Sequence, residues 1–138
     1  MAQRIPWPLF VALLALVPGG CHSAAAPQPV HGKVFYKERP AEGAVVTFVP
    51  LAEDAGGQKY AAVVAADGSY KLSARGTFDG APAGRYAVTV FYLSPEKKVD
   101  GQNAGPDLLG GRYADPKTTP LKVEVKQGDN EIEAFHLK

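Results

Sequence analysis

The chain has very little cysteine and no excess of charge of either sign. It contains one cysteine in 138 residues, so an internal disulfide is excluded. Its 15 basic and 14 acidic residues nearly cancel. Nucleic-acid binding usually shows as a basic excess or a basic stripe, and the sequence has neither. We therefore expect no nucleic-acid partner.

The sequence also lacks an apolar run long enough for a transmembrane helix, which needs roughly 20 residues. The longest run, Leu9–Val17, follows Arg4 and precedes the small residues Gly19 and Gly20 and the lone Cys21. A positive charge, a short apolar segment and small residues at a cleavage point are typical of a secretory signal peptide. We predict a signal peptide over residues 1–20.

The only cysteine lies where cleavage would leave it as the first residue of the mature chain. Gly19, Gly20 and Cys21 resemble the lipobox of bacterial lipoproteins, although Pro18 stands where that motif prefers leucine. The resemblance implies that Cys21 carries a diacylglycerol, and two acyl chains suffice for stable anchoring. The alternative is a secreted protein with a free thiol. The residues that follow show no apolar periodicity, so we predict a flexible tether over 21–29 and a domain over 30–138.

Motifs of catalysis and of metal binding are missing as well. The chain has no Gly-x-Ser-x-Gly and no His-Glu-x-x-His. His22 lies in the tether, and His31 and His136 lie near the ends of two predicted strands. The last two would be neighbours if those strands pair, but two histidines without a third ligand make a poor metal site. We expect no catalytic residue, no metal and no cofactor.

Strand and turn signals are abundant. The 15 glycines and 12 prolines indicate frequent turns and argue against long helices. In Gly84–Tyr92, β-branched, aromatic or small residues fall on both faces, which predicts the central strand of a sheet. The seven predicted strands cover residues 30–36, 44–50, 59–65, 70–73, 84–92, 121–125 and 131–137.

Two local features refine this pattern. Asp67-Gly68 is a tight hairpin signal, because glycine supplies the positive φ that such turns need. In the last strand, Ile132 and Phe135 are three residues apart, whereas a strand repeats every two. We therefore predict a β-bulge near Glu133-Ala134.

Seven short strands with closely spaced turns predict an antiparallel β-sandwich. The series Gly32-Lys33-Val34, Gly43-Ala44-Val45-Val46, Asp67-Gly68-Ser69-Tyr70 and Pro82-Ala83-Gly84-Arg85-Tyr86 resembles the carboxypeptidase regulatory-like domain. The resemblance implies a seven-stranded Greek-key sandwich of the transthyretin-like class. Residues 109–121 also resemble a group of short bacterial lipoproteins that carry this domain.

The transthyretin fold includes hydrolases of 5-hydroxyisourate, which use histidines, an arginine and a terminal Tyr-Arg-Gly-Ser. The sequence ends in Ala134–Lys138 without that tail, so none of those roles carries over and we do not expect an enzyme. Aromatic side chains are spread over the strands, and alternation with apolar neighbours favours core packing over a sugar-binding platform. Phe91 and Tyr92 cannot face the same core.

The connection over residues 94–120 is longer than the roughly 12–15 residues beyond which a loop is usually functional or disordered. Its first half is polar and is predicted to be mobile. In the second half, Leu108, Leu109 and Tyr113 are expected to pack on the sandwich, and Asp107 to cap a short turn. The alternative is a segment that only crosses between the sheets. The candidate contact residues are Lys98, Asp100, Gln102 and Asn103.

Together these features predict a non-catalytic lipoprotein, anchored on the outer side of the cytoplasmic membrane or in the outer membrane of a bacterium. It would act as a binding or structural module with a protein or glycan partner. The alternatives are a carbohydrate- or peptide-binding module that uses the long connection and, less favoured, a hydrolase of the transthyretin fold.

Overall fold

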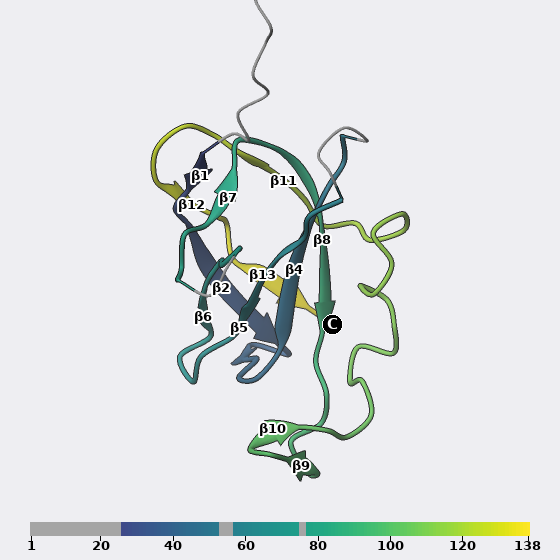
Figure 1. Ribbon diagram of the computed structural model, residues 1–138. Helices are drawn as coiled ribbons and strands as arrows, with labels where there is room; N and C mark the ends of the chain where they lie inside the picture. The colour runs from purple at the N-terminus through teal and green to yellow at the C-terminus, as the bar shows by residue number, and fades with distance from the viewer. Residues whose placement is uncertain (1–25, 53–56, 75–76) are drawn as a thin grey trace, which may run out of the picture.

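The computed structural model describes residues 26–52, 57–74 and 77–138. Within these ranges every regular element is a β-strand, so the fold is all-β (Figure 1). No helix there is long and apolar enough to cross a membrane. The strands are β1 (Pro27–Gln28), β2 (Val30–Tyr36), β3 (Arg39–Pro40), β4 (Val45–Pro50), β5 (Tyr60–Val63), β6 (Ser69–Lys71), β7 (Ala81–Pro82), β8 (Gly84–Phe91), β9 (Lys98–Val99), β10 (Gln102–Asn103), β11 (Lys122–Val125), β12 (Asn130–Glu131) and β13 (Phe135–Leu137).

The first layer is an antiparallel sheet in the order β11-β8-β4-β5, with β8 in its interior. Val88 and Val90 of β8 are fully buried, and Ala87 and Thr89 on the opposite face are buried as well. A strand covered on both faces and paired on both edges is the central strand that the sequence predicts. Its aromatic and β-branched side chains suit that environment.

The second layer is organised around β2. On one edge β2 pairs antiparallel with β6 and β3, and on the other it pairs parallel with β12 and β13. The parallel pairing corrects the expectation of a wholly antiparallel sandwich. Alternation of apolar residues reports which face of a strand is buried, but it does not report the direction of the neighbouring strand.

The predicted bulge in the last strand is confirmed by the register. Glu131 lies opposite His31, and Phe135 lies opposite Val34. The bulged segment, residues 131–135, therefore contains one residue more than the stretch of β2 that it faces, which is the definition of a bulge. The extra residue separates β12 from β13 and returns Phe135 to the core, where only 8% of it is exposed.

The core lies between the two layers and is rich in aromatic rings. Phe48 packs on Tyr86 and Tyr70, with ring centroids 5.8 and 6.4 Å apart, and Tyr70 stacks on Phe135 at 6.3 Å. Two of these ring pairs are tilted and the third is stacked, and aromatic pairs at such distances stabilise a core beyond the area they bury. In the described ranges, five aromatic residues are buried in the core and three more pack against it, in agreement with the alternation: Phe48, Tyr60, Tyr70, Tyr86 and Phe135, and Tyr36, Tyr92 and Tyr113.

On one side of the sandwich, the chain passes from the first layer to the second and the two layers are hydrogen-bonded to each other. The Asp67-Gly68 turn carries the chain from β5 in the first layer to β6 in the second, and Gly68 has a φ of 85°. Hydrogen bonds from the hydroxyl and amide of Ser69 hold the pKa of Asp67 below its ordinary value. Beyond this turn, Ala61 and Ser73 form an isolated bridge between the layers. The turn is confirmed, although its two flanking strands belong mainly to different layers.

Strand pairing begins before residue 30, where the sequence predicts the start of the domain. Pro27 and Gln28 form β1 and pair with Pro82 and Ala81 of β7. Two of the last residues of the predicted tether, 21–29, thus pair with β7 in a separate two-stranded sheet. Prolines and a glutamine gave no strand signal there, because a two-residue strand is too short to show alternation.

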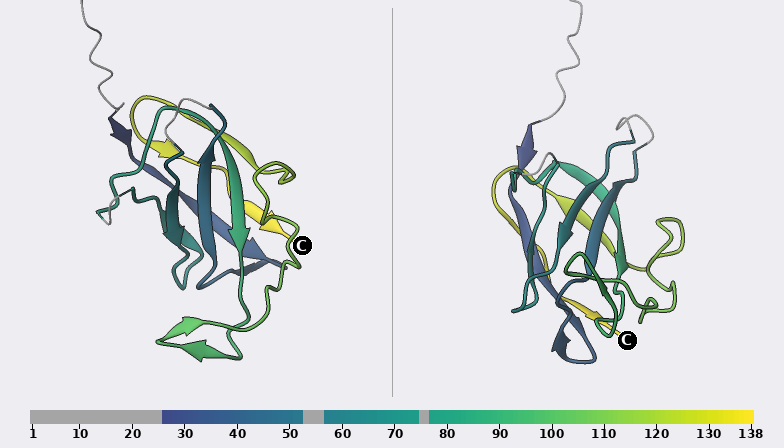
Figure 2. Two further views of the ribbon diagram at one scale, coloured as in Figure 1. Left: turned by 45° about the vertical axis from the view of Figure 1, so that its right-hand side comes forward. Right: turned by 60° about the horizontal axis from the view of Figure 1, so that its bottom comes forward.

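The long connection does not cross between the layers. It starts after β8 and returns along the edge of the same strand before it reaches β11, as Figures 1 and 2 show. The amides of Val88 and Val90 donate to the carbonyls of Leu121 and Tyr113, at 2.8 and 2.9 Å. This part of the connection therefore completes the edge of the first layer beyond the end of β11.

Candidate functional site

The predicted contact residues lie on a two-stranded ribbon that projects from the sandwich (Figure 1). Leu93 and Asp107 bridge its base, and the amide of Ala104 donates to the carbonyl of Lys97 at 2.8 Å. At its tip β9 pairs with β10. The half of the connection expected to be a mobile loop is therefore a hydrogen-bonded ribbon, which corrects the prediction.

The turn at the tip explains why the ribbon forms. Asp100 and Gly101 both have positive φ, 51° and 79°. A two-residue hairpin turn of type I′ requires positive φ at both central positions, and Asp-Gly is a preferred pair there. The sequence contained this signal, but the flanking residues are polar and do not alternate, so no hairpin was predicted.

The four candidate residues do not have the same role. Lys98, Asp100 and Gln102 are exposed at the tip. Asn103 is half-buried, and its Nδ2 donates to the carbonyl of Glu42 at 3.3 Å, which ties the ribbon to the turn before β4. The tip thus offers two opposite charges and an amide, whereas Asn103 supports the ribbon.

The second half of the connection is held as expected by Asp107. Its Oδ1 accepts from the amides of Tyr92 and Leu109, both at 3.1 Å, and its Oδ2 accepts from Gly111 at 3.0 Å. Leu109 is 2% exposed and Tyr113 packs against the core. Leu108 differs from the expectation, because 37% of it is exposed.

The histidines do not form a site together. Although β2 and β13 pair, His136 lies beside Phe35, and its ring stacks on Phe35 with centroids 5.4 Å apart. His31 lies further along β2, and its Nε2 is 3.0 Å from Asp129 Oδ2. The described residues contain no group of three or more side chains that would hold a metal ion.

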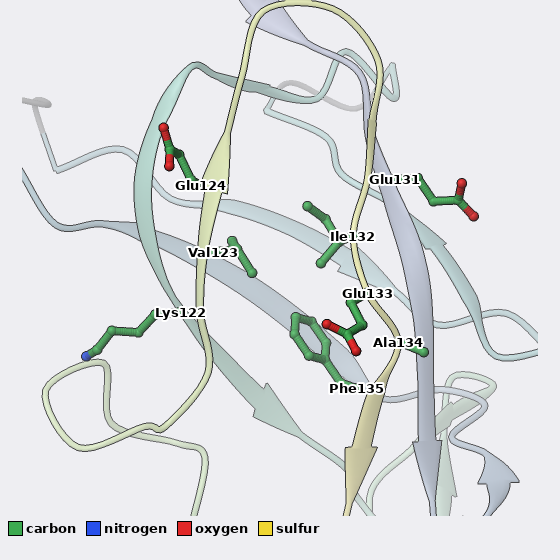
Figure 3. Close-up of a pocket in the computed structure, with 8 residues that line it drawn as sticks. All are labelled: Lys122, Val123, Glu124, Glu131, Ile132, Glu133, Ala134 and Phe135. Carbon is green, nitrogen blue, oxygen red and sulfur yellow. The ribbon is translucent and has the colours of Figure 1, made fainter.

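Sequence reasoning missed a groove between the layers, with a volume of about 300 Å³ (Figure 3). One wall is β11 and the other is the bulged segment. Figure 3 shows Val123, Ile132 and Phe135 projecting into the space between the walls. A second cavity of about 350 Å³ lies on the other side of the bulged segment and is lined by Gly32 and Lys33. The bulge was predicted, but the gap that it opens required the register.

The outer face of the first layer carries an apolar row that the sequence did not predict. Val63 of β5, Val45 of β4 and Phe91 of β8 are cross-strand neighbours. They are 64%, 38% and 43% exposed. Phe91 therefore points away from the core, while Tyr92 is half-buried and packs against it, in agreement with the expectation that the two rings diverge.

Comparisons with known proteins give no family. No protein-family model matches the chain, and no curated protein matches it. Among solved structures, the chain is similar to a DUF3823 family protein from Parabacteroides merdae, with a TM-score of 0.44 and 15% identity. The alignment covers 83% of this chain and 47% of that one, so the chain spans about half the length of the similar structure. Cys21 and the predicted signal peptide lie outside the described residues.

Proposed function

We propose that the protein is a lipid-anchored, non-catalytic binding module of the bacterial cell envelope. Cys21 carries the anchor, on the outer side of the cytoplasmic membrane or in the outer membrane. The domain is a sandwich of the carboxypeptidase regulatory-like, transthyretin-like class. Its partner is a protein or a glycan that contacts the exposed tip of the ribbon at Lys98, Asp100 and Gln102.

The observation that supports this proposal is the distance between the two ends of the domain. In Figure 1 and in the left view of Figure 2, β1 lies at one end of the molecule and the β9–β10 ribbon lies at the other. From Cys21 to Pro27 the chain reaches at most about 20 Å, because an extended residue spans roughly 3.3–3.6 Å. An anchor at Cys21 therefore keeps the β1 end near the membrane and leaves the ribbon free to meet a partner.

The proposal is tested by cross-linking from the two ends of the domain. Gln102→Cys places a thiol on the ribbon, and Gln127→Cys places one in the turn that contacts β1, where the amide of Gly128 donates to Gln28 Oε1. Both positions are exposed. With Cys21 acylated, the new cysteine is the only free thiol of this chain, so a thiol-reactive photo-cross-linker attaches to the protein at one site, and adducts are detected with an antibody to the protein.

We expect Gln102→Cys to give one discrete adduct that is absent from Gln127→Cys. The double variant Lys98→Ala with Asp100→Ala, in the Gln102→Cys background, should reduce the yield of that adduct. The same adducts from both ends, or none from Gln102→Cys, would contradict the proposal.

A further inference from the structure

The β11 wall of the groove is a strand edge with free backbone groups. Val88 N donates to Leu121 O, so Leu121 is a residue whose backbone hydrogen-bonds to β8. This bond decides which residues of β11 turn their backbone groups toward β8 and which turn them away. In an antiparallel pair, alternate residues turn their N–H and C=O groups away from the partner strand. Lys122 and Glu124 are those residues in β11, so their backbone groups point into the groove.

The next residue of this edge whose backbone points away from β8 is Lys126, and its backbone is already bonded to a side chain. Lys126 N donates to Asn130 Oδ1, and Asn130 Nδ2 donates to Lys126 O, both at 2.8 Å. The amide of Asn130, which is 9% exposed, thus imitates the backbone of a partner strand at Lys126. The backbone of Lys126 is thus already paired in the way that an added strand would pair with this edge.

The floor of the groove is apolar and has a buried polar group close by. Val123 and Ile132 are half-buried, and Phe135 stacks on Tyr70. The hydroxyl of Tyr70 is buried beneath Gly32, where it has no hydrogen-bond partner within the described part of the chain. A Cβ at Gly32 would come within 2.7 Å of that hydroxyl, so the glycine makes room for it. The apolar floor favours apolar side chains on an occupant.

The rim of the groove is acidic. Glu124, Glu131 and Glu133 are exposed carboxylates, and Lys122 is the only cation that lines the groove between β11 and the bulged segment. In Figure 3, Glu124 and Glu131 point away from the apolar floor. An extended chain in the groove would turn alternate side chains to the floor and to this rim.

We propose that the groove binds an extended peptide in which apolar and basic residues alternate, and that the peptide adds as a strand to the free edge of β11. Backbone groups of Lys122 and Glu124 hold the peptide, apolar side chains cover Val123 and Ile132, and basic side chains lie beside the glutamates. Strand addition of this kind takes affinity from main-chain hydrogen bonds and specificity from alternate side chains.

The first test uses the full chain in detergent and a fluorescently labelled peptide of sequence Lys-Val-Lys-Val-Lys-Val. The control is the same peptide with glutamate in place of lysine. We expect the lysine peptide to bind about tenfold more tightly, as a few exposed ion pairs would give, and the difference to shrink at high salt. Equal affinity for both peptides, or no binding of either, would overturn the proposal.

The second test separates the backbone from the charge. Glu124→Pro and Glu124→Thr both remove the carboxylate, but only proline removes the amide that points into the groove. The ladder to β8 does not use that amide, and proline is tolerated on an edge strand in this orientation. We expect Glu124→Pro to bind the lysine peptide at least about tenfold more weakly than Glu124→Thr. Equal binding by the two variants would show that strand addition is wrong.

A third measurement needs no variant. Saturating lysine peptide should slow hydrogen exchange at the amides of Lys122 and Glu124, whereas the amide of Val123 already faces β8 and should change little. If the peptide binds without slowing these two amides, it lies elsewhere and the proposal fails. If the two amides are protected without peptide and lose protection on dilution, the occupant is a second copy of the chain, which also overturns the proposal.

Discussion

The carboxylate of Asp107 accepts a hydrogen bond from the backbone amide of Tyr92, with 3.1 Å between Oδ1 and N. The bond ties the connection to the end of β8, and the same carboxylate holds the amides of Leu109 and Gly111. One side chain thus fixes both the base of the ribbon and the turns that follow it.

We predict that Asp107→Ala lowers the free energy of unfolding by about 2 kcal/mol, since three amides lose a charged acceptor. Asp115→Ala is the matched control in the same connection, because Asp115 Oδ1 accepts from a single exposed amide, that of Lys117. Chemical denaturation of both variants checks this. Equal losses would mean that Asp107 acts only as a local turn residue.

Adjacent leucines give a second prediction. Leu109 is 2% exposed and Leu108 is 37% exposed, although both follow Asp107 in the sequence. Leu109→Ala should cost about 2–4 kcal/mol, because it leaves a cavity beneath the connection, whereas Leu108→Ala should cost less than about 1 kcal/mol. Thermal melts of the two variants distinguish them, and a larger loss in Leu108→Ala would contradict the packing described.

The two faces of β8 give a third prediction. Val88 is fully buried between the layers, whereas Phe91 on the opposite face is 43% exposed. Val88→Asp should prevent folding, because an unpaired buried carboxylate costs several kcal/mol against a total stability of about 5–15 kcal/mol. Phe91→Asp should fold. Circular dichroism of both reports the outcome, and a cooperative melt for Val88→Asp at the wild-type temperature would falsify the assignment of the core.

The sequence predicts the strands well where alternation is long. β2 has the predicted bounds, and β4 and β8 differ from theirs by one residue. The bulge was also predictable, because Ile132 and Phe135 break the period of two. What alternation does not contain is the direction of a neighbouring strand. The parallel pairing of β12 and β13 with β2 therefore needed the structure.

The candidate site was less predictable than the fold. Asp107 was recognised as a cap, because its position before an apolar pair is a local signal. The ribbon was missed, since its pairs are held by backbone hydrogen bonds between polar residues. The groove beside β11 was missed because it depends on Val123 and Ile132 lying across from each other, and no local pattern encodes a contact between different layers.

The anchor gives a fourth prediction, for the part of the chain outside the described residues. Wild-type protein should partition into detergent, and mass spectrometry should find Cys21 acylated as the first residue. Cys21→Ala should remain uncleaved or appear in the soluble fraction, because it lacks the thiol that takes the diacylglycerol. An unmodified Cys21 in the mature protein would leave the secreted form with a free thiol as the correct reading.

Two buried tyrosines give the last prediction, because they differ in one hydrogen bond. The hydroxyl of Tyr86 donates to the carbonyl of Pro82 at 2.6 Å, whereas the hydroxyl of Tyr70 has no partner within the described ranges. Tyr86→Phe should lower the free energy of unfolding by about 1 kcal/mol at pH 7. Tyr70→Phe should leave it unchanged or raise it, since it removes a buried polar group that is unsatisfied.

The same pair should differ in alkaline solution. Burial, with a smaller contribution from Tyr60, raises the pKa of Tyr86 to about 12 from an ordinary value of 10.0. The folded state therefore favours the protonated phenol, and this contribution is complete below pH 10 and is lost as the pH rises toward 12. The stability difference between wild type and Tyr86→Phe should shrink over that range.

Burial also raises the pKa of Tyr70, so the stability of Tyr70→Phe relative to wild type should increase as the pH rises. Urea denaturation of the three proteins from pH 8 to the highest pH at which the fold persists measures both trends. A constant gap for Tyr86→Phe would show that its hydroxyl is solvated.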